Sequence, residues 1–290
     1  MEFPAISRRA TNGRIYLAKS ERIPQFPRPS SSRLIHQRRS EGIPCGNSSK
    51  IARPDLRRET KYNMINELIN EMVDAGVHYG HQTKKWNPRM KPFLMKDRGG
   101  IYIIDLEKTV QQLDKASDFL ADIVSKGKKV LFVGCKRQAQ DAIREAAEAT
   151  GQHYVNHRWL GGMLTNSLTV RKSVERLKYL ENIEKQPEFK AMSKKELAAL
   201  GREREKLLRN LRGVRDMDKK PDAVVIVDSA RETIAVAEAR RLNIPIIALV
   251  DTNADPALVQ FPIPGNDDAI RSIRIILQNL VDAMVAARKN

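Results

Sequence analysis

Short apolar runs that alternate with amphipathic helical patterns constrain the fold of this chain more than any other feature. Runs rich in β-branched residues occur at 130–133, 223–227 and 246–250, and each is bounded by polar residues or glycine. Helical spacing of apolar residues covers 106–126, 138–150, 231–242 and 267–288. Shorter apolar runs at 101–105 and 154–155 bring the expected strands to five. The alternation predicts a doubly wound, flavodoxin- or Rossmann-like α/β fold with a parallel sheet covered on both faces.

The segment 166–218 interrupts this alternation. It carries no strand pattern, and its leucines and valines recur at helical spacing on both sides of a break at Gln186-Pro187. The second half has heptad spacing, with Arg204 in one apolar position. We therefore expect an antiparallel helical hairpin, a coiled coil, inserted into the α/β domain. Either it is solvated on all sides, or it docks onto an RNA.

The N-terminal residues 1–63 differ from the rest of the chain. They carry 14 Lys and Arg against 5 Asp and Glu, and scattered prolines break any amphipathic pattern. Three interpretations stay open: a disordered basic extension, an organelle transit peptide, or translation that begins at Met64. Residues 64–290 form the expected folded domain. No apolar run is long enough to span a bilayer, so the protein is expected to be soluble.

The charge balance indicates the kind of partner. The chain has 52 Lys and Arg against 35 Asp and Glu, a net charge of +17, which favours a polyanion. A loop over 77–93 interleaves cations and histidines with Tyr79 and Trp86, as suits phosphates and unstacked RNA bases. A plain surface loop with Trp86 beneath it is the alternative. His78 and His81 have no cysteine or carboxylate cluster nearby in sequence, so no metal site is expected.

A second candidate RNA-binding segment is the decapeptide 157–166, which reads His-Arg-Trp-Leu-Gly-Gly-Met-Leu-Thr-Asn. Arg158 can make a forked contact to a phosphate, and two glycines allow close approach of the backbone. The alternative is a strand-to-helix corner with Trp159 in the core and Thr165 or Asn166 as helix N-cap. Because the decapeptide precedes the hairpin, it is the joint from which the hairpin leaves the sheet.

Little in the sequence supports an enzyme on the same fold. The strand-to-helix turns carry neither a dinucleotide fingerprint nor a phosphate-binding loop. Cys135 lacks a partner histidine at a predictable position, and the two cysteines of the chain form no framework. Asp228 and Asp251 end strands and could bind a divalent ion, but capping or loop carboxylates are the commoner case. We expect no catalysis and no cofactor.

Four blocks together resemble the bacterial-type family of small-subunit ribosomal protein two. They are Ala75–Thr83 with Trp86-Asn87-Pro88, Arg158–Gly162 with Leu164-Thr165-Asn166, Pro221-Asp222-Ala223, and Ile244–Ala269 with its Asp-Thr-Asn-Ala-Asp-Pro and Pro-Ile-Pro-Gly-Asn-Asp-Asp segments. The resemblance runs in order from about Ile65 to the last helix. Members of this family usually begin shortly before the first block, which favours translation from Met64.

The resemblance implies a five-stranded parallel domain with a helical-hairpin insertion and no catalysis. It also implies that the protein belongs to the small subunit of a cytoplasmic bacterial ribosome, with an organelle ribosome as the second choice. There it is expected to bind small-subunit rRNA near the junction of head and body. Implied protein partners are neighbouring small-subunit proteins, including the large ribosomal protein one, which it helps to recruit. The candidate rRNA-binding residues are His78, His81, Lys84, Lys85, Trp86, Asn87, Arg89, Lys91, Lys136, Arg137, Arg158, Trp159, Asn166 and Arg171.

Overall fold

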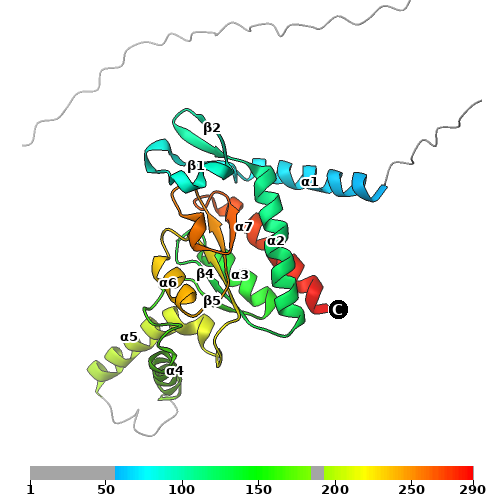
Figure 1. The fold of residues 1–290 in the computed structure, drawn as a ribbon. Coiled ribbons are helices and arrows are strands. Elements are labelled where there is room, and N and C mark those ends of the chain that lie inside the picture. The colour runs from blue at the N-terminus through cyan, green and yellow to red at the C-terminus, as the bar shows by residue number, and fades with distance from the viewer. Residues whose placement is uncertain (1–55, 184–192, 290) are drawn as a thin grey trace, which may run out of the picture. The chain divides into compact units, whose positions relative to one another are not determined.

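The computed structural model describes residues 56–183 and 193–289 of the chain (Figure 1). Helix α1 (Leu56–Asp74) begins before position 64, where the sequence pattern places the start of the folded domain. The expectation for residues 1–55 lies outside the described residues. Among the described helices, none combines the length and the apolar character needed to cross a membrane.

A five-stranded parallel sheet forms the centre of the domain, as predicted. Its strands are β4 (Val130–Val133), β5 (His153–Val155), β6 (Ala223–Val227), β7 (Ile246–Val250) and β8 (Phe261–Pro264). Their spatial order is β5-β4-β6-β7-β8, and every neighbouring pair is parallel. Numbered within the sheet, this is the order 2-1-3-4-5 of flavodoxin-like folds. The first connection places β5 on one side of β4, and the next places β6 on its other side. The strand order therefore reverses between β4 and β6, although all strands stay parallel.

Successive side chains of the central strands enter two separate apolar clusters. On β6, Val225 belongs to the cluster under one face and Val224 to the cluster under the other. The first face is covered by α2 (Leu106–Ser125), α3 (Gln140–Thr150) and α7 (Ile270–Lys289), as Figure 1 shows. The second is covered by α6 (Thr233–Arg241) and the start of the inserted hairpin. This period of two explains why these strands are apolar throughout.

One predicted strand belongs to a different sheet. β3 (Ile101–Ile104) lies between β1 (Tyr79–Gln82) and β2 (Leu94–Arg98) in a small antiparallel sheet. The fifth strand of the parallel sheet is instead β8, which the sequence pattern did not indicate. Two of its four residues are prolines, and proline is tolerated there because β8 is an edge strand paired only with β7.

The loop over 77–93 is more regular than expected. The sequence predicts only an irregular loop over 77–93, and this is wrong for its first part, because β1 pairs with β3 there. Two 3-10 helices follow, η1 (Thr83–Lys85) and η2 (Pro88–Phe93). Proline at the first position of η2 costs nothing, since that backbone N–H would be unsatisfied in any helix.

The insertion is a pair of packed helices, α4 (Ser167–Asn182) and α5 (Lys194–Leu211), followed by η5 (Arg212–Val214). Ser193 and Glu196 form a reciprocal capping box at the start of α5. Arg176 and Glu203 join the two helices through a two-pronged ion pair. The expected break at Gln186-Pro187 lies outside the described residues. The described parts of these helices show no coiled coil.

Candidate nucleic-acid interface

The loop that begins at His78 is held against the carboxyl ends of the parallel strands by Thr252. The Thr252 hydroxyl accepts a hydrogen bond from the His81 backbone N–H at 2.9 Å. The Thr252 carbonyl accepts a second one from the Asn87 backbone N–H at 2.7 Å. A Cβ on Gly80 would lie 2.4 Å from the Thr252 methyl carbon, so glycine is needed at that position. Thr252 itself is fully buried. The loop is therefore a fixed part of the domain surface.

The cations of this loop lie on its outside. Lys84, Lys85 and Lys91 are exposed, and within the described chain none has a carboxylate partner within ion-pair distance. Arg89 is exposed too, but it forms an ion pair with Asp255. The lysines present charge to solvent without internal neutralisation, which is the arrangement that a polyanion requires.

The other candidates in this loop have structural contacts. Trp86 is half-buried against Tyr102, with ring centroids 4.9 Å apart. The Asn87 side chain accepts a hydrogen bond from the Arg89 backbone N–H and caps η2. His78 is half-buried beside the Tyr79 ring, and burial lowers its pKa. The alternative interpretation, a plain surface loop with Trp86 beneath it, agrees with the half-buried position of this tryptophan.

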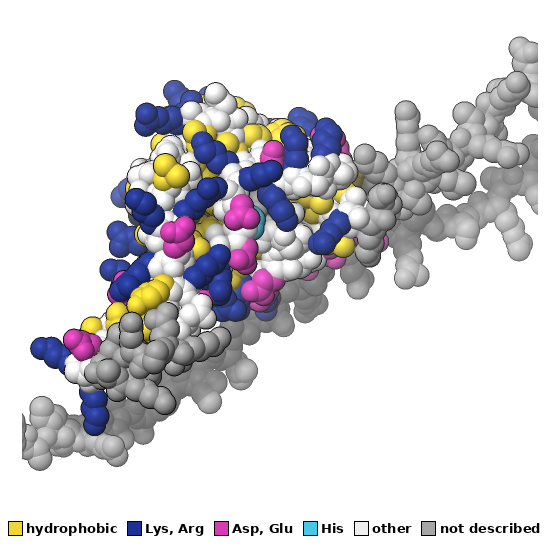
Figure 2. Space-filling view, turned by 90° about the horizontal axis from the view of Figure 1, so that it is seen from below, with side chains coloured by type: hydrophobic (Ala, Val, Ile, Leu, Met, Phe, Trp, Pro, Cys, Tyr) yellow, Lys and Arg dark blue, Asp and Glu magenta, His cyan; other side chains and the backbone are white. Residues whose placement is uncertain are grey.

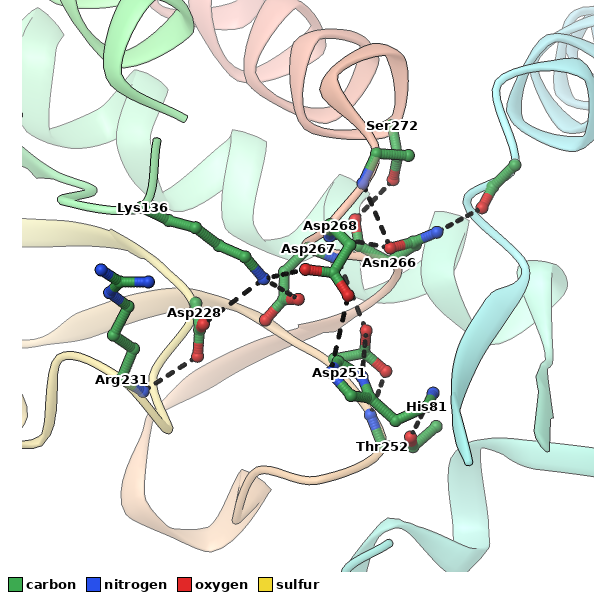
Figure 3. A network of polar contacts seen from close by, with 12 residues as sticks. His81, Lys136, Asp228, Arg231, Asp251, Thr252, Asn266, Asp267, Asp268 and Ser272 are labelled. Carbon is green, nitrogen blue, oxygen red and sulfur yellow. Dashed lines mark hydrogen bonds and ion pairs between the residues drawn. The ribbon is translucent and has the colours of Figure 1, made fainter. Parts of the chain in front are cut away.

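His81 points into a group of carboxylates at the carboxyl ends of the parallel strands (Figure 3). Its Nδ1 lies 3.0 Å from the Asp251 carboxylate and its Nε2 lies 3.6 Å from that of Asp268. The hydrogen bond to Asp251 raises the pKa of His81, against the opposing effect of burial. Sequence reasoning placed no carboxylate near this histidine because 170 residues separate it from Asp251.

Lys136 lies in the same group and is not on the surface. Its ammonium is 2.6 Å from Asp267, 2.6 Å from Asp268 and 3.6 Å from Asp228, and the residue is 7% exposed. Burial opposes its charge, but the bonds to Asp267 and Asp268 raise its pKa overall. Its neighbour Arg137 is exposed. Of the two predicted rRNA contacts after β4, only Arg137 is positioned to reach a ligand.

Asp267 is a nearly fully buried member of this group. It is 1% exposed, and one of its carboxylate oxygens is buried without a hydrogen-bond partner. Burial, together with the charges of Asp228 and Asp251, raises the pKa of Asp267 to about 7. Ligand atoms of His81, Asp251 and Asp267 lie within 4.8 Å of one another, so these three are the described side chains that could share a metal ion.

The raised pKa values of His81 and Asp267 predict a pH dependence. Both groups hold a proton more tightly in the folded than in the unfolded chain, so folding takes up protons, for Asp267 between about pH 4 and 7. The contribution of these two groups to the free energy of unfolding should fall as pH rises through this range, whereas His78 and His153, whose pKa values burial lowers, contribute in the opposite direction. Urea unfolding at several pH values measures it, and Asp267→Asn together with His81→Gln should flatten the profile. Profiles of equal slope for the original chain and this double variant would contradict the prediction.

In the decapeptide, Trp159 is held inside by Glu238 of α6. The tryptophan is 6% exposed, and its Nε1–H donates to the Glu238 carboxylate at 3.1 Å. The same carboxylate accepts from the backbone N–H groups of Gly162, Leu164 and Thr165 and from the Thr165 hydroxyl, at 2.7–3.1 Å. Burial opposes the charge of Glu238, but these bonds outweigh it and lower its pKa. Trp159 is therefore a core residue, and Glu238 organises the loop.

The same loop connects the sheet to the helical hairpin. Gly162 has φ +87°, and a Cβ there would meet the Asn166 side chain at 3.0 Å, whereas Gly161 has open space around it. Asn166 is the N-cap residue of α4, but its side chain accepts from the Thr169 hydroxyl and not from the backbone. Arg158 is exposed, and within the described chain it has no hydrogen bond or ion pair. Arg171, also exposed, donates to the carbonyl of Asp218.

The position that binds a nucleotide in related doubly wound folds is filled by protein side chains. It lies at the carboxyl ends of β4 and β6, where the strand order reverses. Lys136 and Asp228 occupy it, and Asp228 adopts φ 66° with its side chain accepting from the Arg231 backbone N–H. Burial raises the pKa of Cys135 to about 12, which leaves a thiol and no nucleophile.

Comparison with known proteins decides the family. The family model of ribosomal protein S2 matches residues 72–287. The chain belongs to the ribosomal protein S2 family. It is 51% identical to the small ribosomal subunit protein uS2 of Koribacter versatilis over 76% of this chain and 73% of that protein. It is 53% identical to the uS2 protein of Mycobacteroides abscessus over 74% of this chain and 78% of that protein.

Membership in the uS2 family gives the general function. The chain is a structural component of the small ribosomal subunit, acts in translation and is not an enzyme. The family resemblance drawn from the four sequence blocks is therefore confirmed. Figure 2 shows Lys and Arg side chains spread over the face in view, with fewer Asp and Glu side chains among them.

Proposed function

We propose that this uS2 chain binds small-subunit rRNA through the exposed cations of the 84–91 loop, with Arg137 and Arg158 as further contacts. Arg171 is left out of this set because its guanidinium already donates to the Asp218 carbonyl. The observation that carries the proposal is the set Lys84, Lys85 and Lys91, which is exposed on a loop anchored to buried Thr252. A fixed loop loses little conformational entropy when it binds. The net charge of +17 supports a polyanionic partner.

Location and protein partners rest on the family resemblance. By that resemblance the chain sits near the junction of head and body of a bacterial small subunit and helps to recruit the large ribosomal protein one. Co-sedimentation of tagged protein with small subunits through a sucrose gradient tests incorporation. Loss of ribosomal protein one from subunits that lack this chain, with other proteins retained, tests recruitment.

Neutralising Lys84 and Lys85 together should weaken rRNA binding without unfolding the domain. Each lysine that contacts a phosphate contributes about 0.7–0.9 to the slope of log affinity against log salt, so the slope should fall by about 1.5. Filter binding of the Lys84→Gln/Lys85→Gln variant to small-subunit rRNA at several salt concentrations measures it. Lys115→Gln/Arg271→Gln removes two exposed cations from α2 and α7 and should leave the slope unchanged. Equal slopes for both double variants would exclude this loop as a phosphate contact.

A further inference from the structure

A cavity of about 640 Å³ lies at the root of the inserted hairpin. It opens between α4 and the segment 214–220 that leads into β6. Its floor is apolar and well packed: Met163, Leu164, Val174 and Val214 line it, and each is buried. A cavity of this size accommodates several side chains of a second molecule.

The rim of the cavity carries an excess of cations. Lys178, Lys219 and Lys220 line it and are exposed, and among the described residues none forms an ion pair with a carboxylate. The two rim arginines are already engaged, Arg171 by the Asp218 carbonyl and Arg215 by Glu181. Three lysines around an apolar floor thus remain available to a partner.

The chemistry of the lining favours a peptide over a nucleic acid. Among the described residues no aromatic ring lines the cavity, and the planar guanidinium groups there are occupied, so an unstacked base would find no described side chain to stack on. Glu175 and Asp218 also lie on the rim, so a partner must place its negative charges beside the lysines and away from these two side chains. The separate carboxylates of a peptide can do this, whereas the closely spaced charges of a phosphate backbone cannot. Aliphatic or aromatic side chains suit the floor, and carboxylates suit the lysines.

The floor is also held in place before any partner binds. Met163 and Leu164 belong to the loop whose backbone is bound by Glu238, and the Leu164 N–H donates to that carboxylate at 3.0 Å. A preformed apolar surface lowers the cost of ordering on binding. We propose that this cavity docks an acidic amphipathic segment of another protein of the small subunit. The proposal rests on membership of the small subunit and is independent of the rRNA contacts proposed above.

Photo-crosslinking inside the intact small subunit tests this proposal. p-Benzoylphenylalanine is placed at Lys219 in one variant and at Lys178 in another, and at Lys115 on α2 as a control. Subunits containing each variant are isolated by sedimentation, irradiated, and the crosslinked species identified by mass spectrometry. Sedimentation in the same sample reports incorporation, so failure to join the subunit is distinguished from failure to dock a partner.

We expect both cavity positions to crosslink to one and the same protein segment, rich in Asp or Glu and in large apolar residues, and the Lys115 position not to do so. Charge reversal in a Lys219→Glu/Lys220→Glu background should lower the yield from the Lys178 position at least tenfold, and Lys115→Glu/Arg271→Glu should not. A crosslink to rRNA would overturn the proposal. So would a crosslink to a segment without acidic residues, or no crosslink from incorporated subunits at either position.

Discussion

Replacing Glu238 with alanine is expected to destabilise the folded chain by about 4 kcal/mol. The substitution removes one carboxylate that accepts five hydrogen bonds from Trp159 and the loop that follows it. The Trp159 and Leu164 donors are buried, so water cannot replace the lost acceptor there. Each buried donor left without a partner costs about 1–3 kcal/mol, which makes this loss large for a single substitution.

Two further variants locate the cause. Glu238→Gln keeps the shape and one carbonyl oxygen but turns an amide NH₂ toward N–H donors, so an intermediate loss is expected. Glu175→Ala removes an exposed carboxylate from α4 and should change the free energy of unfolding by less than 0.5 kcal/mol, as is usual for surface substitutions. Urea unfolding followed by circular dichroism measures all three. A loss below about 1 kcal/mol for Glu238→Ala would show that the loop does not depend on this carboxylate.

The pH dependence of this effect has a defined sign. The pKa of Glu238 is lowered in the folded chain, so its contribution is present above the unfolded pKa and is lost as pH falls through the folded pKa. The difference in unfolding free energy between the original chain and Glu238→Gln should therefore shrink in acid. Unfolding at pH 7 and pH 4 gives this comparison.

The alternation of strands and helices was enough to predict the sheet, because the central strands pack on both faces. β4, β6 and β7 are apolar and buried at every position. β8 escaped prediction because Pro262 and Pro264 are read as strand breakers, and only its place at the edge makes them acceptable. The Ile101–Ile104 run is strand-like in either sheet, and its local sequence does not say which partner it pairs with.

The burial of Glu238 has a signature in the sequence. Ala235, Glu238, Ala239 and Leu242 follow the i, i+3, i+4, i+7 spacing of a buried helical stripe, and a charged residue in such a stripe needs a buried partner. Its partner, the Trp159 loop, could not be named because pairing across 79 residues depends on how α6 lies on the sheet. Local pattern thus predicts that a group is buried, while the fold determines what it binds.

Lys136 shows the same limit from the opposite side. It follows a strand next to Arg137, so the sequence gives the two cations equal standing as rRNA contacts. In the structure one is buried among three carboxylates and the other is exposed. Asp267 and Asp268 reach Lys136 only because β8 occupies the edge of the sheet and brings the start of α7 back over it. The matched pair Lys136 and Arg137 therefore separates a structural cation from a surface one.

Replacing Lys136 with methionine should destabilise the chain by about 3–5 kcal/mol at neutral pH, the usual cost of removing one partner of a buried ion pair. Methionine fills a similar volume, so the loss reports charge and not packing. Asp267 and Asp228 would be left close together in a buried site without a cation. Arg137→Met is the matched control one residue away, and its free energy of unfolding should change by less than 0.5 kcal/mol.

A double variant shows whether the lost charge or the lost side chain is responsible. Lys136→Met/Asp267→Asn removes the buried cation and its nearest buried carboxylate together, so it should be more stable than Lys136→Met alone. The penalty of the single variant should also shrink as pH falls toward about 7. Lys136 lowers the pKa of Asp267, so without the ammonium this carboxyl takes up its proton at a higher pH and leaves less uncompensated charge. Urea unfolding of the original chain, Lys136→Met, Arg137→Met and the double variant at pH 5 and pH 8 measures both effects. If the double variant is no more stable than Lys136→Met at either pH, the ammonium acts through packing and not as the counter-ion of this carboxylate group.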